Sequence, residues 1–164
     1  CMSNIKHQVI DILGEDCRVS FEQIAVMLGV SVEEVAEAID EMEKDKVILK
    51  YSPIIDWDRT EKTRVEAMIE VKVTPQRDQG FDAVAKRISG YEEVMSVYLM
   101  SGAYDLLVLV EAPTLRELAY FVSEKLSTLD TVTATSTSFV LKRYKQDGVM
   151  FGMAIEDKRL VVSP

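Results

Sequence analysis

The stretch SFEQIAVMLGVSVEEVAEAI, residues 20–39, predicts two helices joined by a very tight turn. Ser20 and Ser31 each stand three residues before a Gln or a Glu, which is the spacing of a capping box at the start of a helix. Gly29 supplies the left-handed residue that ends the first of the two helices. Because only one residue separates Gly29 from Ser31, the helices must cross steeply, as they do in a helix-turn-helix.

The sequence around this stretch completes a small helical domain. Apolar residues at helical spacing predict a helix before it, from about residue 4 to residue 13, which we expect to end at Gly14. After it, an apolar run at residues 47–51 is expected to be extended, and the polar residues 52–63 are typical of a linker. We therefore expect a three-helix helix-turn-helix domain, winged or plain, over residues 3–51.

The remaining sequence alternates between β-rich runs and helical faces. Its pattern predicts four strands and two helices: strands at 65–73, 94–100, 104–111 and 132–144, and helices at 81–90 and 114–126. A short Ser-Gly-Ala connection is expected to join the middle strands as a hairpin, and Thr114 with Glu117 forms a third capping-box pattern. The order βαββαβ predicts a ferredoxin-like domain over residues 64–145 and an α+β chain overall. Residues 146–164 are expected to form a hairpin-like tail.

Charge is unevenly distributed along the chain. The formal net charge is −9, and residues 1–60 hold six Lys and Arg against thirteen Asp and Glu. The expected second helix of the helix-turn-helix is the most acidic part, with seven carboxylates and two lysines between Ser31 and Lys46. Since affinity for nucleic acid comes largely from Lys and Arg that displace counterions, we expect DNA binding weaker than usual for such a domain.

Several function classes find little support in the composition. No apolar run approaches the ~20 residues of a membrane span, and no secretory signal is apparent, so a cytoplasmic protein without membrane contact is expected. His7 is the only histidine, which leaves no His-based catalytic triad and no multi-histidine metal site within one chain. We expect no cofactor, no metal and no enzymatic activity.

Two motifs in the second half carry a family resemblance. The segment SGAYDLLVLVEAP contains Gly102, Tyr104 and Asp105, which resemble the G-x-Y-D effector-loop motif of the Lrp/AsnC family of transcriptional regulators. The segment TSTSFVL, which starts at Thr135, is similar to the T-E-T stretch that opens the last strand in that family. Ser136 stands here where the family usually has a Glu.

The resemblance implies a regulator that binds double-stranded DNA and a small effector. In such regulators the C-terminal domains pair sheet to sheet as homodimers, the dimers assemble into higher oligomers, and an effector, expected to be an amino acid, binds between subunits. Asp105 would accept the ammonium group, while amides near Gly102 and the hydroxyls of Thr135 and Thr137 would meet the carboxylate. Tyr104 belongs to the same motif.

A purely structural interpretation of these residues also stays open. Asp105 would then satisfy local amides in a turn, and the two threonines would belong to an ordinary edge strand. A tight hairpin often needs a residue without Cβ, which would explain Gly102 whatever binds nearby.

The resemblance also suggests where DNA contacts would lie. Arg18 precedes the second helix at a position where the family often places a phosphate-touching Arg, and helix N-termini such as those at Ser20 and Ser31 offer amides to phosphate oxygens. Further basic candidates are Lys44, Lys46 and Lys50.

Two alternatives to a DNA-binding regulator remain open. The first is an effector-binding oligomer with weak or no DNA binding, which acts through a partner regulator and uses the acidic helix as a mimic or repulsive face. The second is an enzyme similar to the siroheme decarboxylases, which resemble the same family. It would need basic groups around a polycarboxylate tetrapyrrole, and the chain offers only the pairs Lys86-Arg87 and Lys142-Arg143.

Overall fold

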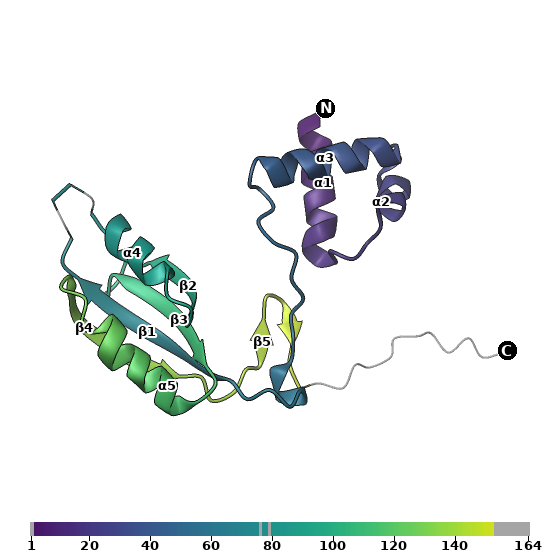
Figure 1. The fold of residues 1–164 in the computed structure, drawn as a ribbon. Coiled ribbons are helices and arrows are strands. Elements are labelled where there is room, and N and C mark those ends of the chain that lie inside the picture. Colours follow the sequence, from purple (N-terminus) through teal and green to yellow (C-terminus); the bar gives the residue numbers. More distant parts are fainter. Residues whose placement is uncertain (1, 76, 79, 153–164) are drawn as a thin grey trace. The chain divides into compact units, whose positions relative to one another are not determined.

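The computed structural model describes residues 2–75, 77–78 and 80–152 and divides the chain into two compact units, residues 1–54 and 55–164. Each unit has its own apolar core, and the first is helical while the second is built on a sheet (Figure 1). Among the described residues, no helix is both long and apolar enough to cross a membrane.

The N-terminal unit is the predicted three-helix helix-turn-helix. Its helices are α1 (Met2–Glu15), α2 (Phe21–Leu28) and α3 (Val32–Lys44). Both predicted capping boxes form, at Ser20 and at Ser31, and Gly29 has the expected left-handed φ of 66°. The prediction that Gly14 ends the first helix is wrong, because α1 continues through it to Glu15.

Apolar packing fixes the crossing of these helices. Val9 of α1, Ile24 of α2 and Val35 of α3 are fully buried against one another in the core of this unit. Residues 47–51, expected to be extended, belong to no strand, so helices alone form the described part of this unit.

The second unit contains the predicted antiparallel sheet with βαββαβ order. Its strands are β1 (Val65–Val73), β2 (Val94–Leu99), β3 (Leu106–Ala112) and β4 (Val132–Phe139), in the spatial order β2-β3-β1-β4. The predicted ferredoxin-like topology is therefore confirmed. The last strand stops at Phe139 rather than Tyr144, and a separate hairpin follows, made of β5 (Lys145–Gln146) and β6 (Val149–Met150). The rest of the predicted tail, residues 153–164, lies outside the described residues.

Two helical segments cover one face of the sheet (Figure 1). They are α4 (Asp82–Ser89) and α5 (Leu115–Tyr120), and α5 continues as a π-helical turn, η2 (Phe121–Leu126). A short 3-10 turn, η1 (Trp57–Arg59), precedes β1. The third capping box forms only in part: Thr114 Oγ1 accepts from the Glu117 amide, whereas no return bond from the Glu117 side chain is seen. The helical pattern predicted the position of the second helix but not its π-helical end.

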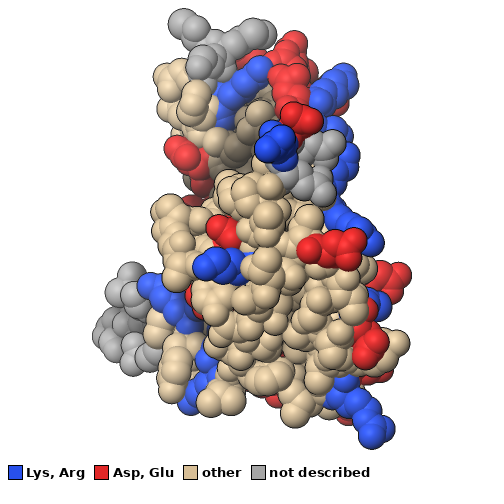
Figure 2. Space-filling view, turned by 90° about the vertical axis from the view of Figure 1, so that its left-hand side faces the viewer, with Lys and Arg blue, Asp and Glu red and all other residues tan. Residues whose placement is uncertain are grey.

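The opposite face of the sheet carries apolar side chains without a cover from the same unit. Residues of β1 alternate, so Ile69 and Val71 are buried under the helices while Met68 points to the other face and is 44% exposed. Leu109 lies directly across from Met68 in the register, and Tyr98 on β2 is 51% exposed. The centre of the visible side of this unit is largely uncharged, with charged side chains at its rim (Figure 2).

Candidate functional site

The outward face of α3 is acidic. The helix buries Val35, Ala38, Ile39 and Met42 against α1 and α2. The side chains opposite this stripe are exposed and follow the helical spacing i, i+4, i+7 and i+11: Glu33, Glu37, Asp40 and Lys44. A partner that approaches this helix from solvent therefore meets three carboxylates and one ammonium group.

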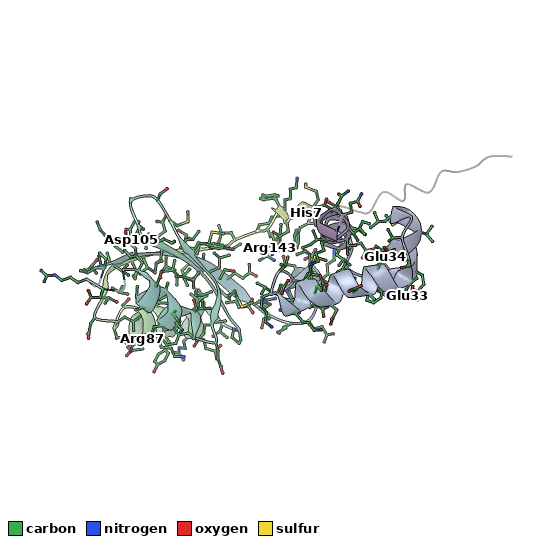
Figure 3. All side chains as sticks on the ribbon, turned by 90° about the horizontal axis from the view of Figure 1, so that it is seen from above. His7, Glu33, Glu34, Arg87, Asp105 and Arg143 are labelled. Atoms are coloured by element: carbon green, nitrogen blue, oxygen red, sulfur yellow. The ribbon has the colours of Figure 1, made fainter. Side chains whose placement is uncertain are left out.

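Several carboxylates of α3 already have partners within the unit. Glu34 accepts from the Ser31 amide at 2.8 Å, Glu41 pairs with Lys6, and Asp40 pairs with Lys44 at 2.7 Å. The Tyr51 hydroxyl donates to Glu43 at 2.8 Å. Glu33 stands in the first turn, where the helix dipole favours an anion (Figure 3). The net acidity that faces solvent thus falls mainly on Glu33 and Glu37.

The predicted DNA-contacting residues lie in two places on the N-terminal unit. Ser20 and Ser31 are the N-caps of α2 and α3, and both hydroxyls accept amide hydrogens of their own helices, at 3.2 and 3.1 Å. Arg18 is exposed in the turn before α2. Lys44, Lys46 and Lys50 lie at or beyond the other end of α3, about 20 Å away from Ser31 for a helix of this length.

Lys44, at the C-terminal end of α3, already pairs with a carboxylate of its own helix. Its hydrogen bond to Asp40 raises the pKa of Lys44, so the ammonium group stays charged but shares its charge with a neighbour. Lys46 has a left-handed φ of 59° just after the helix and is exposed, as is Lys50. Of the three lysines, Lys46 and Lys50 are the better placed to meet a phosphate.

The predicted effector loop is anchored by Asp105. One carboxylate oxygen accepts from the Val73 amide at 2.9 Å, and the Asp105 amide donates to the Val71 carbonyl at 3.0 Å. The Met100 amide donates to the Asp105 carbonyl at 2.8 Å and closes the loop. These bonds tie the loop to the end of β1. The Asp105 carboxylate does satisfy a backbone amide, but that amide is 32 residues away on β1 and is not a local amide of the turn.

Gly102 does not have the structural reason that a tight hairpin would give it. The flanking strands end at Leu99 and start again at Leu106, so the connection is longer than the predicted Ser-Gly-Ala. Gly102 is exposed, is not among the glycines with positive φ, and a Cβ added to it meets no atom within 4 Å. Tyr104, next to Asp105, is half-buried.

The two threonines do not meet Asp105 within one chain. Thr135 pairs with Val71 and Thr137 with Ile69, so β1 lies between them and the strand that follows Asp105. Two strand spacings correspond to about 10 Å. By the same register both threonines share the side of the sheet on which Ile69 and Val71 are buried.

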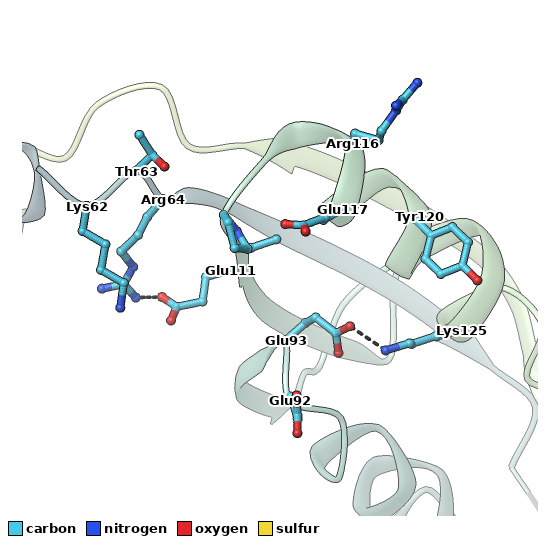
Figure 4. Close-up of a pocket in the computed structure, with 12 residues that line it drawn as sticks. Lys62, Thr63, Arg64, Glu92, Glu93, Glu111, Arg116, Glu117, Tyr120 and Lys125 are labelled. Carbon is cyan, nitrogen blue, oxygen red and sulfur yellow. Dashed lines mark hydrogen bonds and ion pairs between the residues drawn. The ribbon is translucent and has the colours of Figure 1, made fainter.

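A second cluster of charged residues was missed by the sequence analysis. Around the opposite end of the sheet, Arg64 pairs with Glu111, and Lys125 pairs with Glu93 at 2.6 Å (Figure 4). These partners come from four segments that are far apart in the sequence: Arg64 precedes β1, Glu93 precedes β2, Glu111 lies in β3 and Lys125 in η2. No group of metal-ligating side chains occurs anywhere in the described part of the chain.

Comparison with known proteins identifies the family. Residues 66–150 match the Lrp/AsnC ligand binding domain, and residues 2–48 match a winged helix-turn-helix DNA-binding domain. The chain belongs to the Lrp/AsnC family. It is 52% identical to the HTH-type transcriptional regulator YugG of Bacillus subtilis over 158 residues, which cover 96% of this chain and 95% of YugG.

Solved structures of the family share its fold. E. coli AsnC superposes with a TM-score of 0.68 at 19% identity and covers 87% of this chain and 94% of its own. The transcriptional regulator NMB0573 of Neisseria meningitidis, solved as an L-Met complex, superposes with a TM-score of 0.70 at 18% identity, covering 93% and 96%. The protein is thus a DNA-binding transcriptional regulator with a ligand-binding domain, and its relatives are regulators rather than enzymes.

Proposed function

We propose that this family member is a sequence-specific, cytoplasmic transcription regulator whose DNA binding or assembly responds to an amino acid. The proposal is supported by the family, by the geometry of the Gly102 loop, and by the L-Met complex of a regulator with the same fold. The ligand groups would come from Gly102, Tyr104 and Asp105 of one copy and from Thr135 and Thr137 of another.

The single observation that carries the effector proposal is the open space at Gly102. Nothing in the backbone requires a glycine there, and no neighbouring atom of the same chain would obstruct a side chain. A small ligand can therefore approach the loop amides closely, which is a common reason for a glycine in a binding loop. Asp105 holds that loop in place through its hydrogen bond from the Val73 amide. Its carboxylate would also accept hydrogen bonds from the ammonium group of a ligand.

The uncovered face of the sheet supports assembly into homodimers. Met68, Leu109 and Tyr98 would be costly to leave in water, and the same face of a second copy is a chemically matched cover. The separation of Asp105 from the threonines supports an effector site that is shared between copies of the chain.

The acidic face of α3 supports a second candidate function. Glu33, Glu37 and Asp40 would repel phosphate, and only cytosine offers a carboxylate a donor in the major groove. In that case the protein would be an effector-binding oligomer that reads DNA weakly and acts through a partner regulator. Arg18, Lys46, Lys50 and the amides of the first turn of α3 are the groups that favour direct DNA binding.

Fluorescence anisotropy distinguishes these functions. The full chain is titrated into its own upstream DNA and a scrambled duplex, at low and physiological salt, with and without an amino-acid mixture. We expect preference for the upstream duplex and a shift in affinity with amino acids. Absence of binding at both salt concentrations would exclude the DNA-binding function and favour the second candidate.

Two variants of Asp105 separate its two roles. Asp105→Asn keeps an oxygen that accepts from the Val73 amide, so we expect normal stability and loss of the amino-acid response. Asp105→Ala leaves a buried amide without its acceptor and is expected to lower the free energy of unfolding by about 1–3 kcal/mol. A normal amino-acid response in Asp105→Asn would remove Asp105 from the effector site.

A further inference from the structure

A groove of about 670 Å³ opens at the end of the sheet that lies away from the Gly102 loop. Its walls come from the residues before β1, the start of β2, the end of β3, and α5 with its π-helical turn (Figure 4). The volume lies within the range of small-molecule pockets in proteins, about 300–1,000 Å³.

The groove is distinct from the proposed effector site. Asp105 precedes β3 and Glu111 stands near its end, which separates them by about 20 Å along an extended strand. In the view from above, Asp105 and Arg143 lie at opposite ends of the sheet (Figure 3). Arg143 pairs with Glu66, which is directly across from Glu111 in the register and so marks the groove end.

Charged partners organise the inside of the groove. Arg64 is fixed twice, by its ion pair with Glu111 and by the ring of Trp57, whose centroid lies 4.5 Å from the guanidinium carbon. Lys125 is fixed by Glu93 at 2.6 Å and stands 6.0 Å from the centroid of the Tyr91 ring. The π-helical turn places Lys125 here, and such turns recur at functional sites.

Glu93 has one oxygen that these partners leave unsatisfied. Its Oε1 takes the Lys125 ammonium, whereas its Oε2 is buried and has no donor within hydrogen-bond distance among the described residues. Burial alone would raise the pKa of Glu93, but the hydrogen bond from Lys125 and the charge of Lys125 act the other way, and the net result is a lowered pKa. Glu93 is therefore an anion at neutral pH with an unused acceptor, a costly arrangement unless a donor arrives.

The remaining charges favour a cation as that donor. Of the four cationic groups that line the groove, Arg64 and Lys125 form ion pairs, Lys62 Nζ lies 5.0 Å from the centroid of the Trp57 ring, and Arg116 points away from both ion pairs (Figure 4). Glu117 lines the groove and takes part in none of its ion pairs. An anionic ligand would thus meet little free positive charge, whereas a ligand with N–H donors would meet the carboxylates of Glu93 and Glu117. A metal ion fits less well, since the described residues form no cluster of metal-ligating groups.

We infer that the groove binds a small organic cation, a primary amine or guanidinium, whose N–H groups donate to the exposed carboxylate of Glu117 and, once the Glu93 side chain turns its unsatisfied oxygen toward the groove, to Glu93. This site is separate from the amino-acid response proposed at Asp105. It needs neither DNA nor the Gly102 loop, so its failure would leave the proposed function intact.

Isothermal titration calorimetry of the full chain tests the site. The probes are L-arginine, L-lysine and putrescine, with L-leucine, whose net charge is zero, and L-glutamate, whose net charge is negative, as comparisons. We expect heat from the cationic probes and none at this site from the other two. Absence of saturable heat from all three cationic probes at millimolar concentration overturns the inference. The inference also fails if L-leucine binds as tightly as the cationic probes and Glu93→Gln weakens both to the same extent.

Three variants locate the binding. Glu93→Gln should weaken the cationic probe about tenfold or more, because it removes the charged acceptor. Glu117→Gln should weaken it severalfold without changing the melting temperature, since this exposed side chain takes no part in the ion pairs of the groove. Asp105→Asn should leave the binding of putrescine, which is not an amino acid, unchanged.

Other results would point elsewhere. Full binding in both Glu93→Gln and Glu117→Gln, or loss of binding in Asp105→Asn, would place the ligand outside the groove. If Glu93 only held Lys125 for stability, Glu93→Gln would lower the melting temperature and no cationic probe would bind the parent chain.

Discussion

The outward face of α3 and the uncovered face of the sheet are both exposed, but they differ in how far their charged side chains form ion pairs. On α3, Glu33 and Glu37 are exposed and take part in neither of the ion pairs of this helix. The visible side of the N-terminal unit mixes acidic and basic groups (Figure 2). On the sheet, the opposed carboxylates Glu66 and Glu111 are each neutralised, by Arg143 and by Arg64.

The difference indicates two kinds of contact. An apolar face whose carboxylates Glu66 and Glu111 are paired can be buried against protein with little unpaired charge, although Glu70 on the same face is exposed and takes part in none of these ion pairs. A face with unpaired carboxylates stays hydrated unless a partner supplies hydrogen-bond donors or positive charges to those carboxylates. The sheet is therefore suited to permanent assembly, and α3 to a weaker, salt-dependent contact.

The largest expected effect tests the sheet. The double change Met68→Lys with Leu109→Lys places two ammonium groups side by side in the uncovered face. The proposed dimer would bury both apolar side chains, so their loss is expected to weaken it on the order of 100-fold or more. Size-exclusion chromatography with light scattering measures this. The matched control is Leu115→Lys, which is 55% exposed on α5, on the covered side, and should leave the mass unchanged. A double variant that remains fully dimeric would show that another surface holds the copies together.

The acidic face of α3 gives the next effect. Glu33→Gln with Glu37→Gln removes two exposed carboxylates of α3 that take part in neither of its ion pairs, so affinity for scrambled DNA should rise about tenfold at low salt and less at physiological salt. Anisotropy with scrambled and upstream duplexes measures it, and Glu124→Gln in the other unit is the control. If affinity for upstream DNA falls while that for scrambled DNA does not rise, the carboxylates read cytosines rather than repel phosphate.

Local sequence patterns correctly predicted the features that depend on contacts between residues close in the sequence. The capping boxes at Ser20 and Ser31 and the left-handed Gly29 depend on residues within a few positions, and all three are found. The βαββαβ order follows in the same way from periodicity. The third capping box shows the limit of prediction from local patterns. Glu117 has the right spacing, but its side chain lines the groove and does not accept a hydrogen bond from the Thr114 amide.

Long-range contacts account for what the sequence could not predict. The Asp105 carboxylate reaches an amide 32 residues earlier, and Arg143 reaches a carboxylate 77 residues earlier. The groove depends on the pairing of β1 with β3 and on the π-helical turn, neither of which leaves a short motif. A signal was nevertheless present, since the EE pair at Glu92 and Glu93 before a strand is unusual at the edge of a core.

A smaller effect concerns the turn that orients α3. Gly29 has a φ of 66°, so Gly29→Ala is expected to cost about 1–2 kcal/mol of unfolding free energy, although its new Cβ meets no atom within 4 Å. Gly14→Ala has equal space but lies within α1, where it should stabilise by about 0.5–1 kcal/mol. Chemical denaturation of both variants measures the contrast. Equal stability changes in the two would mean that backbone conformation does not decide the α2–α3 turn.

The smallest effect concerns Tyr51, which satisfies a carboxylate of α3. Partial burial, then the hydrogen bond to Glu43 and its charge, raise the pKa of Tyr51 from 10.0 to about 12. Because the folded-state pKa lies above the unfolded-state one, the stabilisation is complete below pH 10 and is lost as the pH rises through about 12. Tyrosinate absorbance during an alkaline titration should lose its highest-titrating step in Tyr51→Phe and keep it in Tyr144→Phe, since Tyr144 is 68% exposed. Persistence of that step in Tyr51→Phe would mean that Glu43 remains unpaired in solution, and α3 would then present one more free carboxylate to any partner.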